Sequence, residues 1–101
     1  MRITLKQLQV FVNTAKLESI SLGAEKCFIS QAAASMSLSQ LENMLGVTLF
    51  DRVGKRIRLN TNGHNLLAKA VQILDKVEEF EIFATNDKSI IGKITIGAST
   101  T

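Results

Sequence analysis

The feature that most constrains this chain is a row of apolar residues, separated alternately by four and three positions, within residues 62–85. This is the a/d spacing of a helix that pairs with another helix, and it persists for nearly three heptads. At 1.5 Å per residue the helix is about 36 Å long, more than a domain of about 60 residues can cover. We therefore predict a helix–helix dimer interface, with packing inside the same chain as the alternative. The predicted seam contains Leu66, Ala70, Ile73, Val77, Phe80 and Ala84.

Patterns for three shorter helices precede this seam. The first covers 5–17 and opens with a capping box formed by Thr4 and Gln7. The second is short, about 20–27, and the third covers about 31–45. The side chains expected to face the core are Leu5, Leu8, Phe11, Val12 and Ala15, then Ile20, Ala24 and Cys27, then Ala34, Leu38, Leu41 and Leu45.

After the third helix the apolar period changes from helical to alternating. Val47 and Leu49, then Ile57 and Leu59, alternate with polar residues and predict two short strands, with a turn at Gly54 between them. Three helices, a hairpin and a long helix together predict a mostly α fold. We expect a winged helix-turn-helix, formed by three helices and a β-hairpin wing, followed by a long dimerisation helix.

Basic residues are concentrated in the first part of the chain. Residues 1–64 hold eight of the twelve Lys and Arg but only four of the nine Asp and Glu. Half of these basic residues lie in the predicted hairpin, a distribution typical of a loop that faces phosphates. A solvated turn is the alternative. The cluster consists of Arg52, Lys55, Arg56 and Arg58.

The sequence lacks the residues that several classes of function require. One Cys and one His cannot form a disulfide or a structural zinc site, and no catalytic set is visible, so we expect neither an enzyme nor a cofactor. No apolar run approaches the ~20 residues of a membrane span, and the N-terminal segment lacks a signal peptide's apolar stretch, so we expect a cytoplasmic protein. We interpret His64 as an exposed helix residue and Cys27 as a buried core residue, in preference to a catalytic or redox role.

The predicted third helix carries no charged residue between Ser30 and Gln40. Neutral side chains can still read DNA, because Gln forms two hydrogen bonds with adenine and Ser bonds to almost any base edge. The small Ala32 and Ala33 allow the helix to lie deep in a major groove. An acidic or apolar exposed face would instead favour a protein partner. The neutral donors are Gln31, Ser35, Ser37, Ser39 and Gln40.

Four segments resemble the LysR family of transcription regulators in order and spacing. The most specific are Ser-Gln-x-Ala-x-Ser, beginning at Ser30, and Leu-Glu-x-x-Leu-Gly-x-x-Leu-Phe-x-Arg, beginning at Leu41. Each segment alone is a weak signal, but together they are specific, and the similarity covers about 4–97. The four segments are 19–26, 29–35, 41–52 and 57–63.

The resemblance implies a winged helix-turn-helix that a linker helix joins to a two-lobed effector-binding domain. We expect the DNA-binding domain at 1–60, the linker and dimerisation helix at 61–86, and a hinge with the first strand of a truncated effector domain at 87–101. Gly92–Gly97 alternates like that strand. The chain is therefore expected to be a piece of a bacterial regulator, which would sense a small-molecule effector only as the full-length protein.

The resemblance also implies the contacts to DNA. Lys55 matches the wing-tip position that enters the minor groove, where narrow A·T-rich tracts attract a cation. Arg56 and Arg58 are expected on phosphates, and Ser30 and Thr4 are expected to cap helices and touch the DNA backbone. Contacts to base edges are expected from Gln31, Ala32, Ser35 and Met36.

Four positions depart from the family pattern. Gly23, Cys27 and Asn60 keep the size or the capping role of the usual residue and should not change the fold. Met36 stands where many members carry Arg or Lys, so the operator preference should differ. Arg52 belongs to the family motif but follows a Leu-Phe pair that is expected to be buried, and we interpret it as mainly structural.

These features predict sequence-specific binding of double-stranded DNA by a homodimer. Two-fold symmetry would then require an inverted-repeat operator, with half-sites about one helical turn or a multiple of it apart. The alternative is a protein-binding adaptor with the same fold, since fold alone does not decide function. The basic cluster and the polar third helix favour DNA.

Overall fold

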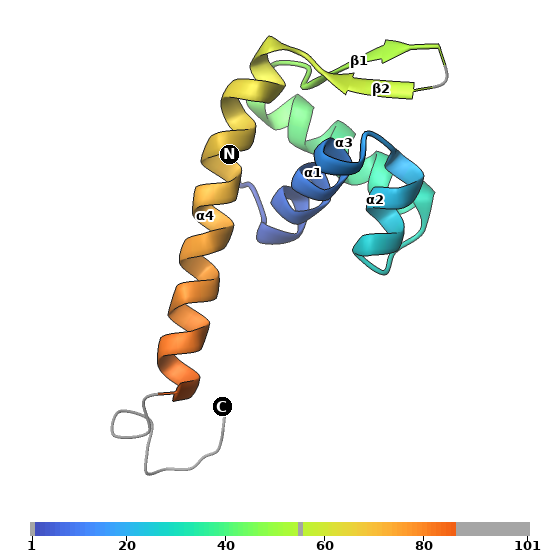
Figure 1. The fold of residues 1–101 in the computed structure, drawn as a ribbon. Helices are drawn as coiled ribbons and strands as arrows, with labels where there is room; N and C mark the ends of the chain where they lie inside the picture. The colour runs from blue at the N-terminus through green and yellow to red at the C-terminus, as the bar shows by residue number, and fades with distance from the viewer. Residues whose placement is uncertain (1, 55, 87–101) are drawn as a thin grey trace. The chain divides into compact units, whose positions relative to one another are not determined.

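The computed structural model describes residues 2–54 and 56–86 of the 101-residue chain (Figure 1). The chain divides into two compact units, Met1–Val71 and Gln72–Thr101. The first unit contains three helices, a hairpin and the first turns of a fourth helix. The proposed minor-groove residue Lys55 and the predicted strand at Gly92–Gly97 lie outside the described residues, so both stay predictions.

The first three helices follow the predicted boundaries closely. Helix α1 spans Leu5–Leu17, α2 spans Ile20–Lys26 and α3 spans Gln31–Leu45. Each begins after a hydroxyl side chain that accepts the backbone N–H three residues further on, which satisfies one free donor of the first turn. The predicted capping box is confirmed, because Gln7 Oε1 accepts the Thr4 N–H at 3.0 Å. The capping residues are Thr4, Ser19 and Ser30.

The core of the first unit forms around α1, which contacts both α2 and α3. Phe11 packs edge to face on Phe50, with ring centroids 5.8 Å apart. The prediction that Leu5 faces the core is wrong, since this residue lies in the first turn of α1 and is exposed. Cys27 and Leu45 are half-buried, because each lies at the C-terminal end of its helix. The most deeply buried side chains are Val10, Phe11, Thr14, Leu41 and Leu49.

The wing is an antiparallel hairpin of two strands, β1 (Phe50–Val53) and β2 (Arg56–Leu59). Figure 1 shows it along one side of the helices, with its turn at the end remote from the first turn of α4. Gly54 supplies the positive φ of 66° that this turn requires. The hairpin confirms the predicted wing, but its first strand begins at Phe50, later than the alternation from Val47 predicted.

Leu49 is a core residue that precedes the hairpin. Its backbone N–H donates to Glu42 Oε2 at 2.7 Å, and its carbonyl accepts the Asn60 N–H at 3.0 Å. Its side chain is fully buried. The alternating pattern predicted Leu49 as a strand residue, but it is a buried core residue ahead of β1. Its N–H is bonded to the Glu42 side chain and not to a facing strand.

Helix α4 spans Thr61–Asn86, one residue longer at each end than the 62–85 indicated by the apolar spacing. Asn60 caps it, since its Oδ1 accepts the Gly63 N–H at 2.8 Å while its Nδ2 donates to the Thr48 carbonyl at 2.9 Å. Gly63 approaches the Leu49 carbonyl so closely that an added methyl would overlap it. The first turn of α4 is thus bonded and packed directly onto the segment that leads into the wing.

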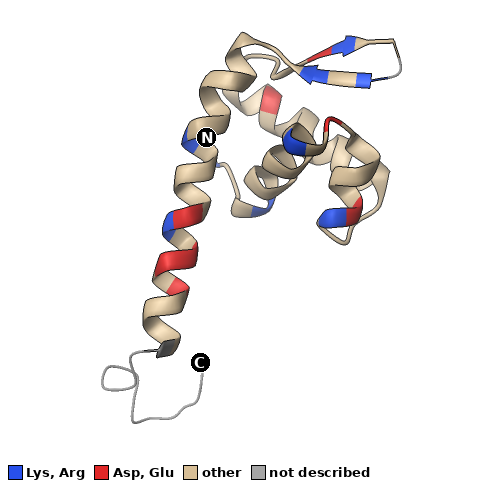
Figure 2. Ribbon diagram, in the orientation of Figure 1, with Lys and Arg blue, Asp and Glu red and all other residues tan. Residues whose placement is uncertain are grey.

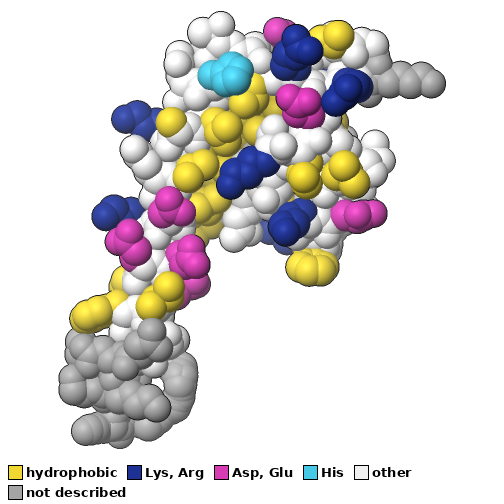
Figure 3. Space-filling view, in the orientation of Figure 1, with side chains coloured by type: hydrophobic (Ala, Val, Ile, Leu, Met, Phe, Trp, Pro, Cys, Tyr) yellow, Lys and Arg dark blue, Asp and Glu magenta, His cyan; other side chains and the backbone are white. Residues whose placement is uncertain are grey.

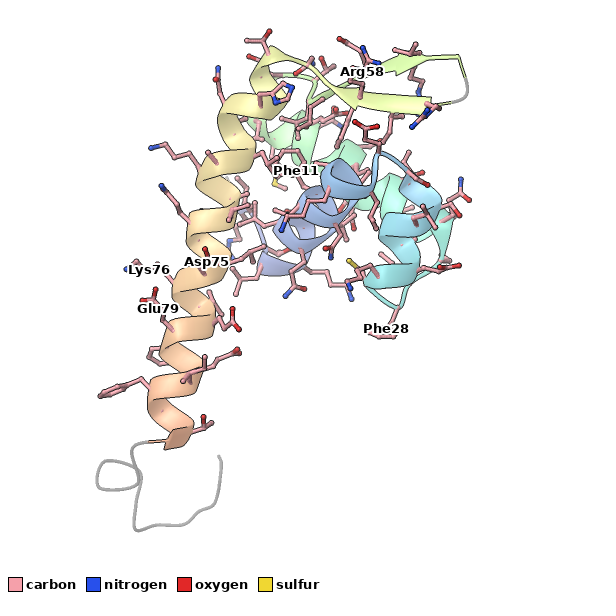
Figure 4. The ribbon with its side chains drawn as sticks, in the orientation of Figure 1. Phe11, Phe28, Arg58, Asp75, Lys76 and Glu79 are labelled. Carbon is pink, nitrogen blue, oxygen red and sulfur yellow. The ribbon has the colours of Figure 1, made fainter. Side chains whose placement is uncertain are left out.

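The described part of the second unit consists of the rest of α4, from Gln72 to Asn86. Acidic and apolar side chains share its surface (Figure 3). Lys76 and Glu79 lie on the same side of the helix, 3.5 Å apart (Figure 4). Within the described ranges, no helix combines the length and apolar character needed to cross a membrane.

Candidate nucleic-acid interface

Helix α3 presents small and neutral side chains on the face opposite its buried stripe. Ala34, Leu38 and Leu41 are buried. Met36 is 62% exposed, and Ser35 is half-buried at the edge of the same face. The sequence of this helix contains no Lys, Arg, Asp or Glu before Glu42. Of the predicted base-contact residues, Gln31, Ala32 and Met36 are exposed.

The hairpin carries three arginines, all exposed (Figure 2). Arg56 and Arg58 flank the buried Ile57 on β2, so their side chains leave the opposite face of the strand. Figure 4 shows Arg58 on this hairpin. Arg52 is paired across the ladder with Ile57 and therefore shares the face that turns toward the helices. It is nevertheless exposed, which is unusual for a residue with a purely structural role.

Two open hollows are each lined by residues of both the hairpin and α3. One is bordered by Arg52 together with Ser35 and Ser39 of α3. The other is bordered by Arg52 and Arg56 of the hairpin, Gln31 of α3 and the first residues of α2. The structure thus places the predicted base-contact residue Gln31 beside Arg52 and the predicted phosphate contact Arg56.

Thr4 and Ser30, the two helix caps predicted to touch the DNA backbone, donate their hydroxyl hydrogen to no acceptor among the described residues. Ser30 Oγ accepts the Ala33 N–H at 3.0 Å, and Thr4 Oγ1 accepts the Gln7 N–H at 3.1 Å. Both residues are exposed. A hydroxyl that accepts a backbone N–H can still donate its own hydrogen. Each can therefore combine its capping role with a hydrogen bond to a phosphate oxygen.

The predicted dimer seam divides between the two units. In the first unit Leu66 is half-buried and Ala70 is only 3% exposed, so Ala70 packs within its own chain and has little surface left for a partner. In the second unit Phe80 is 74% exposed and Ile73 is also exposed, while Val77 and Ala84 are half-buried. Most of the seam's free apolar surface therefore belongs to the part of α4 after Val71.

The model of the bacterial regulatory helix-turn-helix protein family named lysR matches residues 5–64, more than half of the chain. This chain belongs to the LysR family. The match begins with α1 and ends in the first turn of α4, so it contains the whole helix-turn-helix and the wing. The family is one of regulatory proteins, in agreement with the prediction that the chain is not an enzyme.

LysR-family relatives match along nearly the whole chain. YeiE of Escherichia coli K12, an uncharacterized HTH-type transcriptional regulator, is 42% identical over 101 residues, which are all of this chain and 33% of the relative. The oxidized form of Corynebacterium glutamicum OxyR is similar in structure, with a TM-score of 0.80 and 37% identity, over 85% of this chain and 28% of that one. The chain spans about a third of the length of the curated relatives it matches.

A third comparison concerns DNA directly. The DNA-binding domain of CbnR, solved in complex with DNA, has a TM-score of 0.73 and 28% identity, over 77% of this chain and 90% of that one. These comparisons confirm the predicted family and the winged helix-turn-helix fold of its DNA-binding domain.

Two features of this LysR-family chain were not found from its sequence. Phe28 is 94% exposed at the end of α2, with a positive φ of 59°, although an apolar residue between two helices is usually read as core. Figure 4 shows its ring pointing away from the helices. Glu18 forms an ion pair with Arg56, and nothing local in the sequence could indicate it, because the partners lie 38 positions apart.

Proposed function

We propose that this chain binds double-stranded DNA in a sequence-specific manner, as a homodimer on an inverted-repeat operator. The observation that carries the proposal is the neutral, exposed face of α3 beside a hairpin with three exposed arginines. A neutral helix can enter a major groove and read base edges, while the arginines supply the attraction to phosphates. The solved complex of the CbnR domain with DNA supports this assignment by similarity.

In this proposal the base contacts come from Gln31, Ala32, Ser35 and Met36. Gln31 can bond both N6 and N7 of an adenine, and the Ala32 methyl can contact a thymine methyl. Met36 has a long, exposed and uncharged side chain, so it adds apolar contact without the preference for guanine that an arginine would bring. A·T-containing half-sites are therefore expected.

Contacts to the DNA backbone are assigned to the helix caps and the wing. Thr4 and Ser30 donate through their hydroxyls, Arg56 and Arg58 bind phosphates, and Lys55 enters the minor groove. The position of Arg52 beside Gln31 favours a phosphate contact for it as well, in place of the mainly structural role expected from the sequence. These contacts add affinity that depends on salt but carries no sequence information.

The dimer is assigned to α4. Ile73, Val77, Phe80 and Ala84 follow the a/d spacing over the second unit, and their exposed apolar surface would be covered by the same helix of a second chain. Leu66 would extend the seam, and Ala70 would contribute little. In the full-length protein, a further domain would bind a small-molecule effector. The protein as a whole would act in the cytoplasm.

The proposal is tested by selecting bound duplexes from a random pool and measuring affinity for the selected sequences at two salt concentrations. We expect enrichment of an inverted repeat, with affinity that falls steeply as salt rises. Enrichment of a single half-site would contradict the homodimeric operator but keep the DNA-binding assignment. Absence of binding at low salt would overturn the proposal and favour the protein adaptor.

A further inference from the structure

An acidic side chain holds one of the proposed phosphate-binding arginines in the DNA-free chain. Arg56 Nη2 on β2 donates to Glu18 Oε1, at the end of α1, with a separation of 3.4 Å. The Arg56 and Glu18 side chains are 76% and 52% exposed. Both residues border the hollow that also contains Gln31 and Arg52. The carboxylate therefore lies inside the surface proposed to face DNA.

The backbone at Glu18 points to a role for its side chain. Glu18 is the C-terminal cap of α1 and adopts a left-handed conformation, with φ 52° and ψ 37°. This conformation favours glycine, because a β-carbon crowds the following carbonyl. Here it is occupied by a residue whose carboxylate reaches across to the hairpin. An exposed ion pair adds little to stability, so stability alone does not explain its presence.

DNA binding and the ion pair make competing demands on Arg56. A phosphate that binds the Arg56 guanidinium has to replace the Glu18 carboxylate or share the guanidinium with it. If the carboxylate stays, it lies close to a phosphate of the same sign of charge, and the two repel. In either case part of the favourable interaction between Arg56 and the phosphate is offset by Glu18.

We infer that Glu18 is an internal counter-ion of the DNA-binding surface, which competes with the phosphate backbone for Arg56 and lowers the affinity of the chain for any duplex. This inference rests on the proposed function and adds a residue that tunes it. Because phosphates occur in every sequence, the effect applies to operator and unrelated DNA alike. Its result is weaker non-specific binding at a given salt concentration, while the reading of bases by α3 is unaffected.

The test is a double-mutant cycle on DNA affinity. Dissociation constants are measured for the wild type, Glu18→Gln, Arg56→Gln and the double variant, on a selected operator duplex and on an unrelated duplex. Gln keeps the length and the β-carbon of Glu, so the backbone conformation is not relieved. The control is Glu25→Gln, since Glu25 is exposed on α2 and borders a different hollow from Arg56. It makes the same change in net charge.

We expect Glu18→Gln to tighten binding to both duplexes by roughly two- to fivefold more than Glu25→Gln does, the scale of one exposed ion pair. This advantage should disappear in the Arg56→Gln background, where there is no guanidinium to compete for. The affinity gain of Glu18→Gln relative to that of Glu25→Gln should also fall toward a ratio of one as salt is raised, because exposed charge pairs are screened. A melting curve of each variant checks that folding is unchanged.

Three outcomes would overturn the inference. The first is equal tightening by Glu18→Gln and Glu25→Gln, which would reduce the effect to net charge. The second is a Glu18→Gln gain that persists without Arg56, which would show direct repulsion of phosphate instead of competition. The third is an Arg56→Gln variant that binds as well as the wild type. In each case the wild type still binds DNA, whereas a wild type that binds no duplex would overturn the proposed function itself.

Discussion

Gln31 is the residue whose replacement should change DNA selectivity most. It is exposed at the first position of α3, and its amide can satisfy both the donor and the acceptor of an adenine edge. We expect Gln31→Ala to weaken operator binding by about 1–3 kcal/mol and to weaken binding to unrelated DNA much less. Competition titrations with both duplexes measure the difference. Gln9→Ala, an exposed glutamine on α1, is the control. Equal losses on all DNA would contradict base reading by Gln31.

Asn60 is a single residue that serves two elements. Its side chain caps α4 through the Gly63 N–H and bonds to the carbonyl and the hydroxyl of Thr48 ahead of the wing. Asn60→Ala should lower the free energy of unfolding by about 1–2 kcal/mol, because a helix cap and a tether are lost together. Chemical denaturation measures this. Asn43→Ala, at an exposed position on α3, should lower the free energy of unfolding much less. Equal losses for the two variants would show that the Asn60 cap does not stabilise the chain more than an ordinary surface residue does.

At the scale of elements, the approach of α1 to α2 depends on Gly23. A methyl at this position would meet the Thr14 hydroxyl and lie 2.9 Å from the Thr14 α-carbon. Thr14 is fully buried, and its hydroxyl has no hydrogen-bond partner among the described residues. Gly23, which was expected from the sequence not to change the fold, therefore sets how closely these two helices can approach.

Gly23→Ala should destabilise the chain by about 1–3 kcal/mol despite the better helix propensity of Ala, because the core is overpacked. In a Thr14→Ala background the same substitution should cost less, since the hydroxyl that it meets has been removed. Thermal and chemical unfolding of the four combinations gives the coupling. Ser21→Ala, exposed on the same helix, should change stability by less than about 0.5 kcal/mol. If Gly23→Ala costs the same stability with and without Thr14→Ala, the contact between these two residues does not limit how closely α1 and α2 pack.

At the scale of the whole molecule, the proposed homodimer depends on the apolar face of α4. Phe80 is largely exposed at a d position of the seam, so a charge there should be harmless to a single chain and costly at a helix–helix interface. We expect Phe80→Glu to convert a dimer into a monomer in sedimentation experiments and to weaken operator binding. Gln72→Glu introduces the same charge at an exposed position outside the seam and should leave the dimer intact. A Phe80→Glu protein that still dimerises would remove this face of α4 from the interface.

Much of the fold could be predicted because its signals are local. Helix boundaries and the capping box at Thr4 depend on residues within about four positions of one another. The same holds for the exposed polar face of α3, which follows directly from helical spacing. The basic hairpin was predicted from its composition and its turn glycine, although not the start of its first strand.

Tertiary structure decided what depends on residues far apart in the chain. Leu49 became a core anchor because Glu42 and Asn60 bond to its backbone, and the first strand therefore begins after it. Ala70 has little surface to offer the predicted seam, because only 3% of it is exposed in the folded chain. The pairing of Glu18 with Arg56 arises only when the end of α1 and the hairpin meet. By itself the sequence determined the elements and their exposed chemistry, since these follow from short-range geometry. The packing of distant segments determined which side chains remain free to bind, because burial and charge pairing require neighbours that the local sequence does not contain.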